Sequence, residues 1–389
     1  RRWRIAGHDA AGPRPWRAAL RVLRRAIPLL LTVPAWASAQ AVFDVTTQVL
    51  TVPVVDVAGQ PYRDLKLRLD PDGRVSIVSL VGPPGTPAPE LASRVAAATA
   101  TAQGSGNACA PVRPFYWEIG DRTQKLAGGS VDSAVSVTTY EAGTPMSIAS
   151  ASKWIYAAYV AERRGGTLTT EDIQFLNFRS GYDNMSFGGC DTRDAVASCV
   201  GRNSNGVRTP ADVDRFYYNG GHMQKHASLP APGMGLGALD NAGLAAEVRR
   251  VLGTDINLLY TQPQLAGGIT TTARDYATFL RKLLAGQLKM STWLGTSAVC
   301  TNPTMCTSAV YAPLPASLSW HYSVGHWTED DPQADGAFSS PGAFGFYPWI
   351  DATRSYYGVL ARGDFGGAVT DSIGCGALIR RAWTTGVAQ

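Results

Sequence analysis

Ser150 and Lys153 are spaced so that their side chains can do chemistry together. Residues three apart on a helix are neighbours on its surface, so the hydroxyl and the amine can touch if this run is helical. A buried lysine loses hydration, which lowers its pKa and lets it accept the proton of an adjacent hydroxyl. The pair therefore predicts an activated serine nucleophile. The alternative is a structural pair, in which Ser150 caps the helix and Lys153 extends its stem to reach water.

The residues around this pair predict a helix that starts near Ser150 and stops at Gly165. Pro145 lies before it and a glycine pair closes it, which is typical of a helix start and a helix end. From Trp154 to Ala161 almost every position is apolar. The helix should therefore lack a solvent-facing side and cross the middle of the domain.

Residues 1–39 have the pattern of an export leader, with arginines, then an apolar run, then small residues before Gln40. The leader holds eight arginines and Asp9, so the formal charge of +5 becomes about −2 for the rest of the chain. The basic balance therefore gives no reason to expect nucleic-acid binding. The apolar run is too short to span a membrane, so we expect a mature protein without a span, periplasmic or secreted.

Composition divides the remaining chain into three parts. Residues 40–82 alternate in short β-like runs with turn signals between them, which predicts a small β module. Residues 83–107 are rich in Pro, Ala and Gly and predict a linker. In residues 108–389, strands at both ends enclose a helical middle. This order predicts an α+β domain whose sheet is made from both ends of the chain.

Six cysteines, an even number, suit an oxidising compartment. Two pairs are close in sequence, which leaves the outer two to join the ends of the catalytic region. The predicted bridges are Cys190–Cys199, Cys300–Cys306 and Cys109–Cys375. The alternative is that some of the six are buried free thiols.

Several segments, in this order, resemble motifs of the serine β-lactamase and penicillin-binding-protein superfamily, particularly class C β-lactamases and their esterase relatives. Ser150 and Lys153 match the S-x-x-K motif, and Tyr217 and Asn219 match the Y-x-N motif. Residues 176–182 and 264–280 resemble two further marker segments. The resemblance covers roughly residues 110 to 385. It implies a β-lactamase/transpeptidase-like fold, with an antiparallel sheet flanked by helices and a helical region.

The resemblance also implies a role for each matched residue. Tyr217 would lie beside Lys153, whose ammonium would lower the tyrosine pKa, and would carry the proton that activates Ser150. Asn219 would hold the substrate carbonyl or the lysine. The alternative is that the aromatic stretch around Tyr217 belongs to the core or the surface.

The third motif of the family is a basic residue, a second residue and a glycine on an edge strand. Here Ser340 stands at the basic position and Gly342 at the glycine, which lets a substrate approach the backbone. The resemblance implies that the amides of Ala343 and Ser150 form the oxyanion hole. A serine at position 340 binds a substrate carboxylate less well than a lysine does, unless Arg362 restores the charge.

We therefore expect an exported serine hydrolase that acts through an acyl-enzyme on short-chain carboxylic esters, without a metal or a cofactor. The alternatives are an amide hydrolase, acting on a β-lactam or a D-amino-acid peptide, and a non-catalytic envelope protein that binds through its β module. His222 and His226 share one helix face, but the glutamate of a zinc-hydrolase motif is absent, so no metal site is predicted. The oligomeric state stays open.

Overall fold

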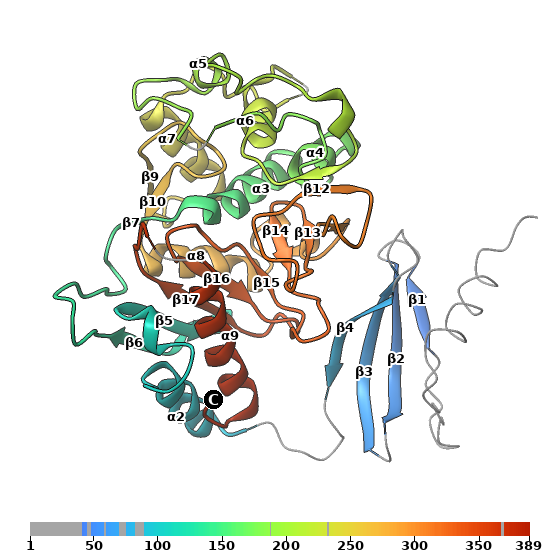
Figure 1. The fold of residues 1–389 in the computed structure, drawn as a ribbon, viewed down its shortest axis with the longest axis vertical. Coiled ribbons are helices and arrows are strands. Elements are labelled where there is room, and N and C mark those ends of the chain that lie inside the picture. Colours follow the sequence, from blue (N-terminus) through green and yellow to red (C-terminus); the bar gives the residue numbers. More distant parts are fainter. Residues whose placement is uncertain are drawn as a thin grey trace, which may run out of the picture.

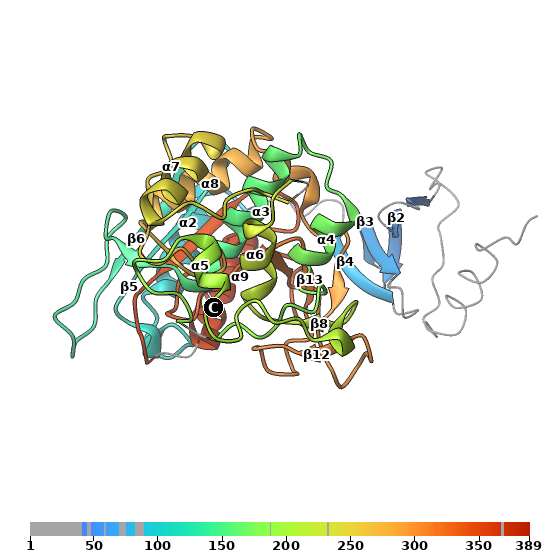
Figure 2. The same cartoon turned by 90° about the horizontal axis from the view of Figure 1, so that it is seen from above.

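The computed structural model describes residues 41–44, 48–57, 60–69, 75–81, 89–186, 188–231, 233–366 and 369–389. The predicted leader, residues 1–39, lies outside these ranges, as do residues 83–88 of the predicted linker. The described chain folds into a small sheet beside a larger α+β body, which confirms the predicted fold class (Figure 1, Figure 2). No helix within these ranges is long and apolar enough to cross a membrane.

The small sheet is an antiparallel meander near the start of the chain. Its strands, paired in this order, are β1 (Val42–Asp44), β2 (Val49–Val57), β3 (Gln60–Leu69) and β4 (Val75–Val81). Leu65 and Leu67 of β3 are buried against one face of this sheet. Arg68, the next residue of β3, joins the sheet to the body. Its guanidinium donates hydrogen bonds to Asp330 Oδ2 (3.2 Å) and to the carbonyl of Gly295 (3.0 Å).

The main sheet is antiparallel throughout and is made from both ends of the catalytic region, as predicted. Its strands are, in spatial order, β11 (Val299–Cys300), β13 (His321–Ser323), β14 (His326–Thr328), β15 (Phe338–Ser339), β16 (Tyr347–Ile350), β17 (Tyr357–Ala361), β5 (Phe115–Gly120) and β6 (Lys125–Val131). All six residues of β5 are buried, because β5 lies inside the sheet between β17 and β6.

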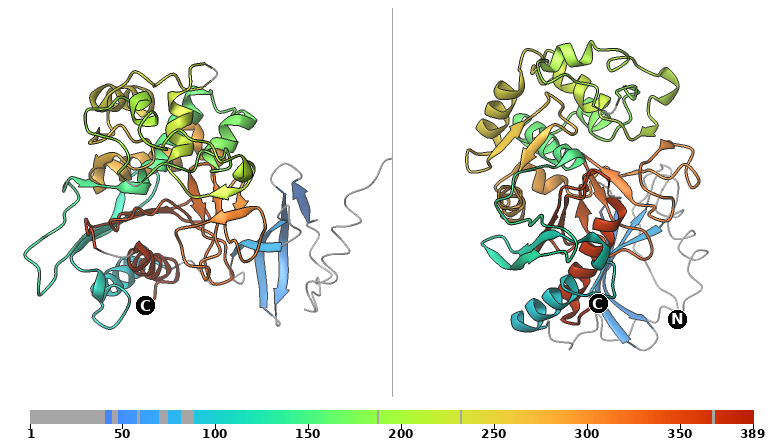
Figure 3. Two further views of the ribbon diagram at one scale, coloured as in Figure 1. Left: turned by 45° about the horizontal axis from the view of Figure 1, so that its top comes forward. Right: turned by 60° about the vertical axis from the view of Figure 1, so that its left-hand side comes forward.

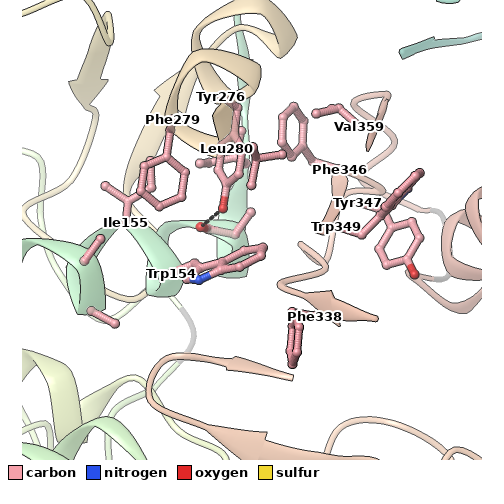
Figure 4. Close-up of a cluster of buried hydrophobic side chains, with 14 of the residues drawn as sticks. Trp154, Ile155, Tyr276, Phe279, Leu280, Phe338, Phe346, Tyr347, Trp349 and Val359 are labelled. Carbon is pink, nitrogen blue, oxygen red and sulfur yellow. Dashed lines mark hydrogen bonds between the residues drawn. The ribbon is translucent and has the colours of Figure 1, made fainter. Parts of the chain in front are cut away.

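Helices cover both faces of this sheet. On one face lie α2 (Leu91–Ala102) and α9 (Val369–Thr385), and on the other lie α3 (Ser152–Arg163) and α8 (Ala273–Leu284) (Figure 1, Figure 3). Between α3, α8 and the sheet, aromatic side chains such as Trp154, Tyr276 and Phe346 form the core (Figure 4). Every residue of α3 from Ser152 to Ala161 is buried, as the apolar run predicts.

Helix α2 corrects the predicted linker. Residues 91–102 were expected to be part of it because they are rich in alanine, yet they form a helix that packs against α9. Ala97, Ala98 and Ala102 are buried there, because small side chains allow two helices to approach closely. Arg94 adds a hydrogen bond to the carbonyl of Trp383 (3.2 Å).

A helical region packs against the middle and the C-terminal part of α3. It contains α4 (Thr170–Leu176), α5 (Val196–Val200), α6 (Gly221–Ser228) and α7 (Asn241–Leu252), with four single-turn segments elsewhere, η1 (Ala110–Val112), η2 (Ala149–Ala151), η3 (Pro210–Asp212) and η4 (Lys289–Trp293). Two small sheets complete it, formed by β7 (Met146–Ser147), β10 (Ile269–Thr271) and β9 (Leu258–Tyr260), and by β12 (Ala309–Tyr311) with β8 (Phe216–Tyr217).

The structure forms the three disulfides that the sequence predicts. Cys109–Cys375 ties the start of the catalytic region to α9, whereas Cys190–Cys199 and Cys300–Cys306 each close a short loop. All six cysteines are paired, so the alternative of buried free thiols is wrong.

Candidate active site

Ser150 and Lys153 are in contact where η2 runs into α3. The ammonium of Lys153 donates one hydrogen bond to Ser150 Oγ (2.9 Å) and one to the carbonyl of Ala266 (2.8 Å). The three-residue spacing places both side chains on one side of the helix, as predicted. The alternative, a lysine that extends to water, is wrong, because Lys153 is only 4% exposed.

Burial gives this lysine the character of a base. Loss of hydration disfavours the charged amine and lowers the pKa of Lys153 to about 7. Its nitrogen also lies 4.8 Å from the centre of the Tyr218 ring, over the face that attracts a cation. A substantial fraction of the amine is therefore neutral at neutral pH and can accept a proton from Ser150.

The backbone that carries the nucleophile is held on several sides. Ala149, directly before Ser150, has a φ of 42°, a left-handed conformation that is strained for a residue with a side chain. The amide of Ile148 donates to the carbonyl of Ile269 (3.0 Å), and the Tyr276 hydroxyl donates to the carbonyl of Ala151 (2.9 Å), the bond drawn in Figure 4. These bonds over-determine the strained turn and orient Ser150 toward the pocket.

The structure brings Tyr218, and not Tyr217, to the Ser150–Lys153 pair. Tyr218 lines the same pocket as Ser150 and Lys153, and its hydroxyl contacts Ser150. Tyr217 does not line this pocket, and its ring lies 5.3 Å from that of Tyr311. The Y-x-N match therefore selects the wrong tyrosine for contact with the nucleophile.

Strand geometry explains this one-residue difference. Successive side chains of a strand point to opposite sides, so the residue two after buried Phe216 shares its direction. That residue is Tyr218, whose ring packs against Trp327 in the core (5.4 Å). The apolar residue Phe216, two positions before Tyr218, was the signal in the sequence that could have identified Tyr218.

The expected low tyrosine pKa is not found. Burial, partly offset by the contact with Ser150, raises the pKa of Tyr218 to about 12. Burial and then the charge of Asp183 raise the pKa of Tyr217. Tyr218 is therefore protonated at neutral pH and suited to donate a proton, while the lysine accepts one.

Asn219 lines the pocket, but its side chain is already engaged. Its amide nitrogen donates to the carbonyl of Met185 (3.0 Å), and its oxygen accepts from the amide of Gly221 (2.8 Å). It contacts the first turn of α6 and the loop that forms one pocket wall. The geometry makes Asn219 a positioning residue and gives it no contact with Lys153.

Ser340 and Gly342 pack against the backbone that carries Ser150. The hydroxyl of Ser340 donates to the backbone carbonyl of Ser150 (3.2 Å), and the side chain is buried. A side chain at Gly342 would collide with the carbonyl of Ile148, so the glycine lets two backbone segments approach each other. Both residues support the nucleophile, and neither lines the pocket as the expected substrate-binding roles require.

Ala343 follows in an exposed turn at the edge of the pocket. Within the described chain its amide makes no hydrogen bond, so it is open to an incoming oxygen. Its neighbour Phe344 forms part of the pocket wall. This placement agrees with the implied oxyanion role of the Ala343 and Ser150 amides, which stays a proposal.

The pocket has a volume of about 440 Å³. Lys153 is the one charged residue among the described residues that line it. Arg362, the alternative source of positive charge, lies elsewhere, because its guanidinium bonds the carbonyl of Val112 (2.6 Å) and the carboxylate of Asp364 (2.5 Å). Among its described residues the site therefore offers no free cation to a substrate carboxylate.

The two histidines considered for a metal site serve the core. His222 bonds the hydroxyl of Ser180 (2.7 Å), and His226 bonds Tyr156 (2.9 Å) and Asp172 (2.9 Å). In the part of the chain that the structure describes, no group of three or more acidic, histidine or cysteine side chains is arranged to hold a metal ion.

Comparisons with known proteins establish the fold. No protein-family model matches this sequence, and no curated protein matches it. A provisionally assigned β-lactamase from Bacteroides dorei aligns over 65% of this chain and 86% of its own, with 21% identity and a TM-score of 0.50. Simvastatin synthase from Aspergillus terreus aligns over 75% of this chain and 99% of its own, with 10% identity and a TM-score of 0.51. These likenesses confirm the β-lactamase/transpeptidase-like fold that the sequence predicts.

Proposed function

We propose that this chain, which has the β-lactamase/transpeptidase-like fold, is a serine hydrolase that cleaves carboxylic esters through an acyl-enzyme on Ser150. The observation that carries the proposal is the 2.9 Å contact between the Ser150 hydroxyl and a buried Lys153 amine with a pKa of about 7. A non-catalytic protein has no need of a buried lysine whose charge lowers stability. The contact therefore argues against the binding-protein alternative.

The proposed reaction uses groups that lie around this contact. Neutral Lys153 accepts the Ser150 proton as Oγ attacks the ester carbonyl, and the amides of Ser150 and Ala343 stabilise the oxyanion. Tyr218 donates its proton to the departing alkoxide and recovers one from the lysine ammonium. Water then attacks the acyl-enzyme, giving a proton to the regenerated base, and the acid leaves as Ser150 takes that proton back.

The charge of the pocket supports an ester over a β-lactam or a peptide. A β-lactam and the C-terminus of a peptide carry a carboxylate, whose binding is strong when a cation meets it. Position 340 is a buried serine and Arg362 is paired with Asp364, so the site favours an uncharged substrate. Amide hydrolysis remains the second candidate, and the experiment below separates the two.

Three disulfides support export as part of the proposal, because such bridges persist in oxidising compartments. We therefore place the enzyme in the periplasm or outside the cell, acting on a small uncharged molecule. Fractionation of the producing cells, with the protein detected in each fraction, tests this location.

The decisive experiment compares nitrophenyl butyrate with a chromogenic cephalosporin. Ester turnover by the wild type should vanish in Ser150→Ala and persist in Ser355→Ala, which removes an exposed hydroxyl after β16. A phosphonate should add mass to the wild type and not to Ser150→Ala. Preferential turnover of the cephalosporin would reverse the substrate assignment, and no Ser150-dependent turnover or labelling would sink the hydrolase proposal.

A further inference from the structure

We propose that Phe344 and Phe365 form an apolar ledge that binds the acyl chain of the substrate and makes medium-chain esters better substrates than short-chain ones. The inference rests on the proposed function and names the substrate class of that same site. It rests on two observations: the position of Phe344 beside the oxyanion amide, and the pairing of its ring with the exposed ring of Phe365.

Phe344 is fixed next to the reacting carbonyl. It directly follows Ala343, whose open amide is proposed to bind the oxyanion, and its side chain forms part of the pocket wall. An acyl group whose oxygen meets that amide must therefore start its chain near the Phe344 ring. An aromatic face at this place favours a hydrocarbon over a polar or charged group.

Phe365 extends this surface out of the pocket. Its ring lies 4.4 Å from that of Phe344, yet the residue is 78% exposed. The pairing is built into the backbone, because the amide of Asp364 donates to the carbonyl of Phe344 (2.9 Å) and joins the two turns. Asp364 is held in turn by Arg362, so the charges beside Phe365 are paired with each other.

The segment between β6 and β7, which extends away from the body (Figure 1, Figure 3), borders a hollow beside Phe365. This hollow of about 220 Å³ is mixed in character, because Arg113, Arg362 and Asp364 line it together with Ser136 and Phe365. The residues on either side of Ser136, Val135 and Val137, are fully exposed. Tyr140 anchors the segment through its hydroxyl, which donates to the carbonyl of Gly363 (3.0 Å).

Phe365 is an exposed apolar side chain in contact with a residue of the pocket wall, and such a surface marks the path of an apolar ligand. The occupant is assigned to the acyl side, because the ledge begins at the oxyanion amide. A hydrocarbon chain fits the charge of the site, since Lys153 is the one charge among the described pocket residues and is used by the reaction.

A chain-length series tests the ledge. A fully buried methylene is worth roughly a fourfold gain in binding, so a chain that lies on an open surface should gain about twofold per methylene. The wild-type kcat/KM should therefore rise about sixteenfold from nitrophenyl butyrate to nitrophenyl octanoate, measured below the micelle concentration of each ester. Phe365→Ser should lower the octanoate value about tenfold and the butyrate value less than twofold.

The control is Leu91→Ser, which removes an exposed apolar side chain from α2 on the other side of the sheet. Its chain-length profile should match that of the wild type, and melting curves should show that both variants are folded. The proposal is refuted if the wild-type kcat/KM does not rise with chain length, or if Phe365→Ser lowers kcat/KM by the same factor for every chain length. Failure of the proposed function is distinct, because the butyrate reaction would then not depend on Ser150 at all.

Discussion

The pKa of Lys153 sets a pH dependence that can be measured. Burial lowers this pKa from 10.5 to about 7. At pH 7 a lysine with a pKa of 10.5 is neutral in about 0.03% of molecules, whereas a lysine with a pKa of about 7 is neutral in about half. Because the neutral amine accepts the Ser150 proton, kcat/KM should rise about tenfold between pH 6 and pH 8 and then level off. Tyr218, with its pKa raised to about 12, should cause no second change below about pH 10.

The assay is the hydrolysis of nitrophenyl butyrate from pH 5 to 10, read at the isosbestic wavelength of nitrophenol. The rate measured with Ser150→Ala is subtracted at each pH. Lys153→Arg keeps a charge that does not titrate in this range, so its activity should fall by about 10²–10⁴ and show no rise near pH 7. A flat wild-type profile from pH 6 to 9, or a midpoint near pH 10, would refute the assignment of Lys153 as the base.

The same pKa shift links Lys153 to the free energy of unfolding. Between about pH 7 and 10.5 the folded protein binds fewer protons than the unfolded chain, so stability rises with pH across this window. The buried charge of Lys153 thus lowers the free energy of unfolding by roughly 5 kcal/mol at most, from a pKa shift of about 3.5. This destabilisation is present in full below pH 7. Lys153→Met removes the cost but leaves the Ala266 carbonyl unpaired, which costs roughly 1–3 kcal/mol. In urea at pH 6.5 the variant should be more stable by about 2–4 kcal/mol; by about pH 10 the sign should reverse, because the cost of the unpaired carbonyl does not depend on pH. A less stable variant at pH 6.5 would contradict the argument.

Three further predictions concern the residues around the nucleophile. Tyr218→Phe should lower kcat about 10²–10⁴-fold, whereas kcat of Tyr217→Phe, the matched control one residue away, should stay within about threefold of the wild type. Equal losses of ester turnover in the two variants would refute the assignment of Tyr218 as the proton donor. Gly342→Ala should lower both the melting temperature and kcat, at roughly 1–3 kcal/mol of stability, because its side chain meets the Ile148 carbonyl; an unchanged melting curve would speak against this. Ser340→Ala should reduce stability in urea by roughly 0.5–1.5 kcal/mol and leave KM for nitrophenyl butyrate unchanged, whereas a large rise in KM would restore a substrate-binding role.

Local spacing predicted the features that depend on local geometry. The contact of Ser150 with Lys153 follows from one helical turn, and the apolar run after it predicted the buried helix α3. The sheet built from both chain ends followed from the order of strand and helix patterns. Each of these inferences needed only neighbouring residues or the sequence order of elements.

Features that depend on contacts between distant segments were missed. Tyr218 was passed over because motif spacing was given more weight than the two-residue alternation that starts at buried Phe216. Ser340 was expected to meet substrate, but it packs under Ser150, a residue 190 positions earlier in the chain. Helix α2 is buried by α9 at the other end of the chain, and no residue near α2 records that contact.

The main sheet has a consequence for the order in which activity appears. Strand β5, made early, finds its neighbour β17 only when residues 357–361 are available, and the proposed oxyanion amide of Ala343 arrives with the same part of the chain. A chain truncated before residue 338 holds Ser150 and Lys153 but lacks strands β15, β16 and β17 and helix α9. On the proposed mechanism, the active site is therefore incomplete until the last strands join the sheet.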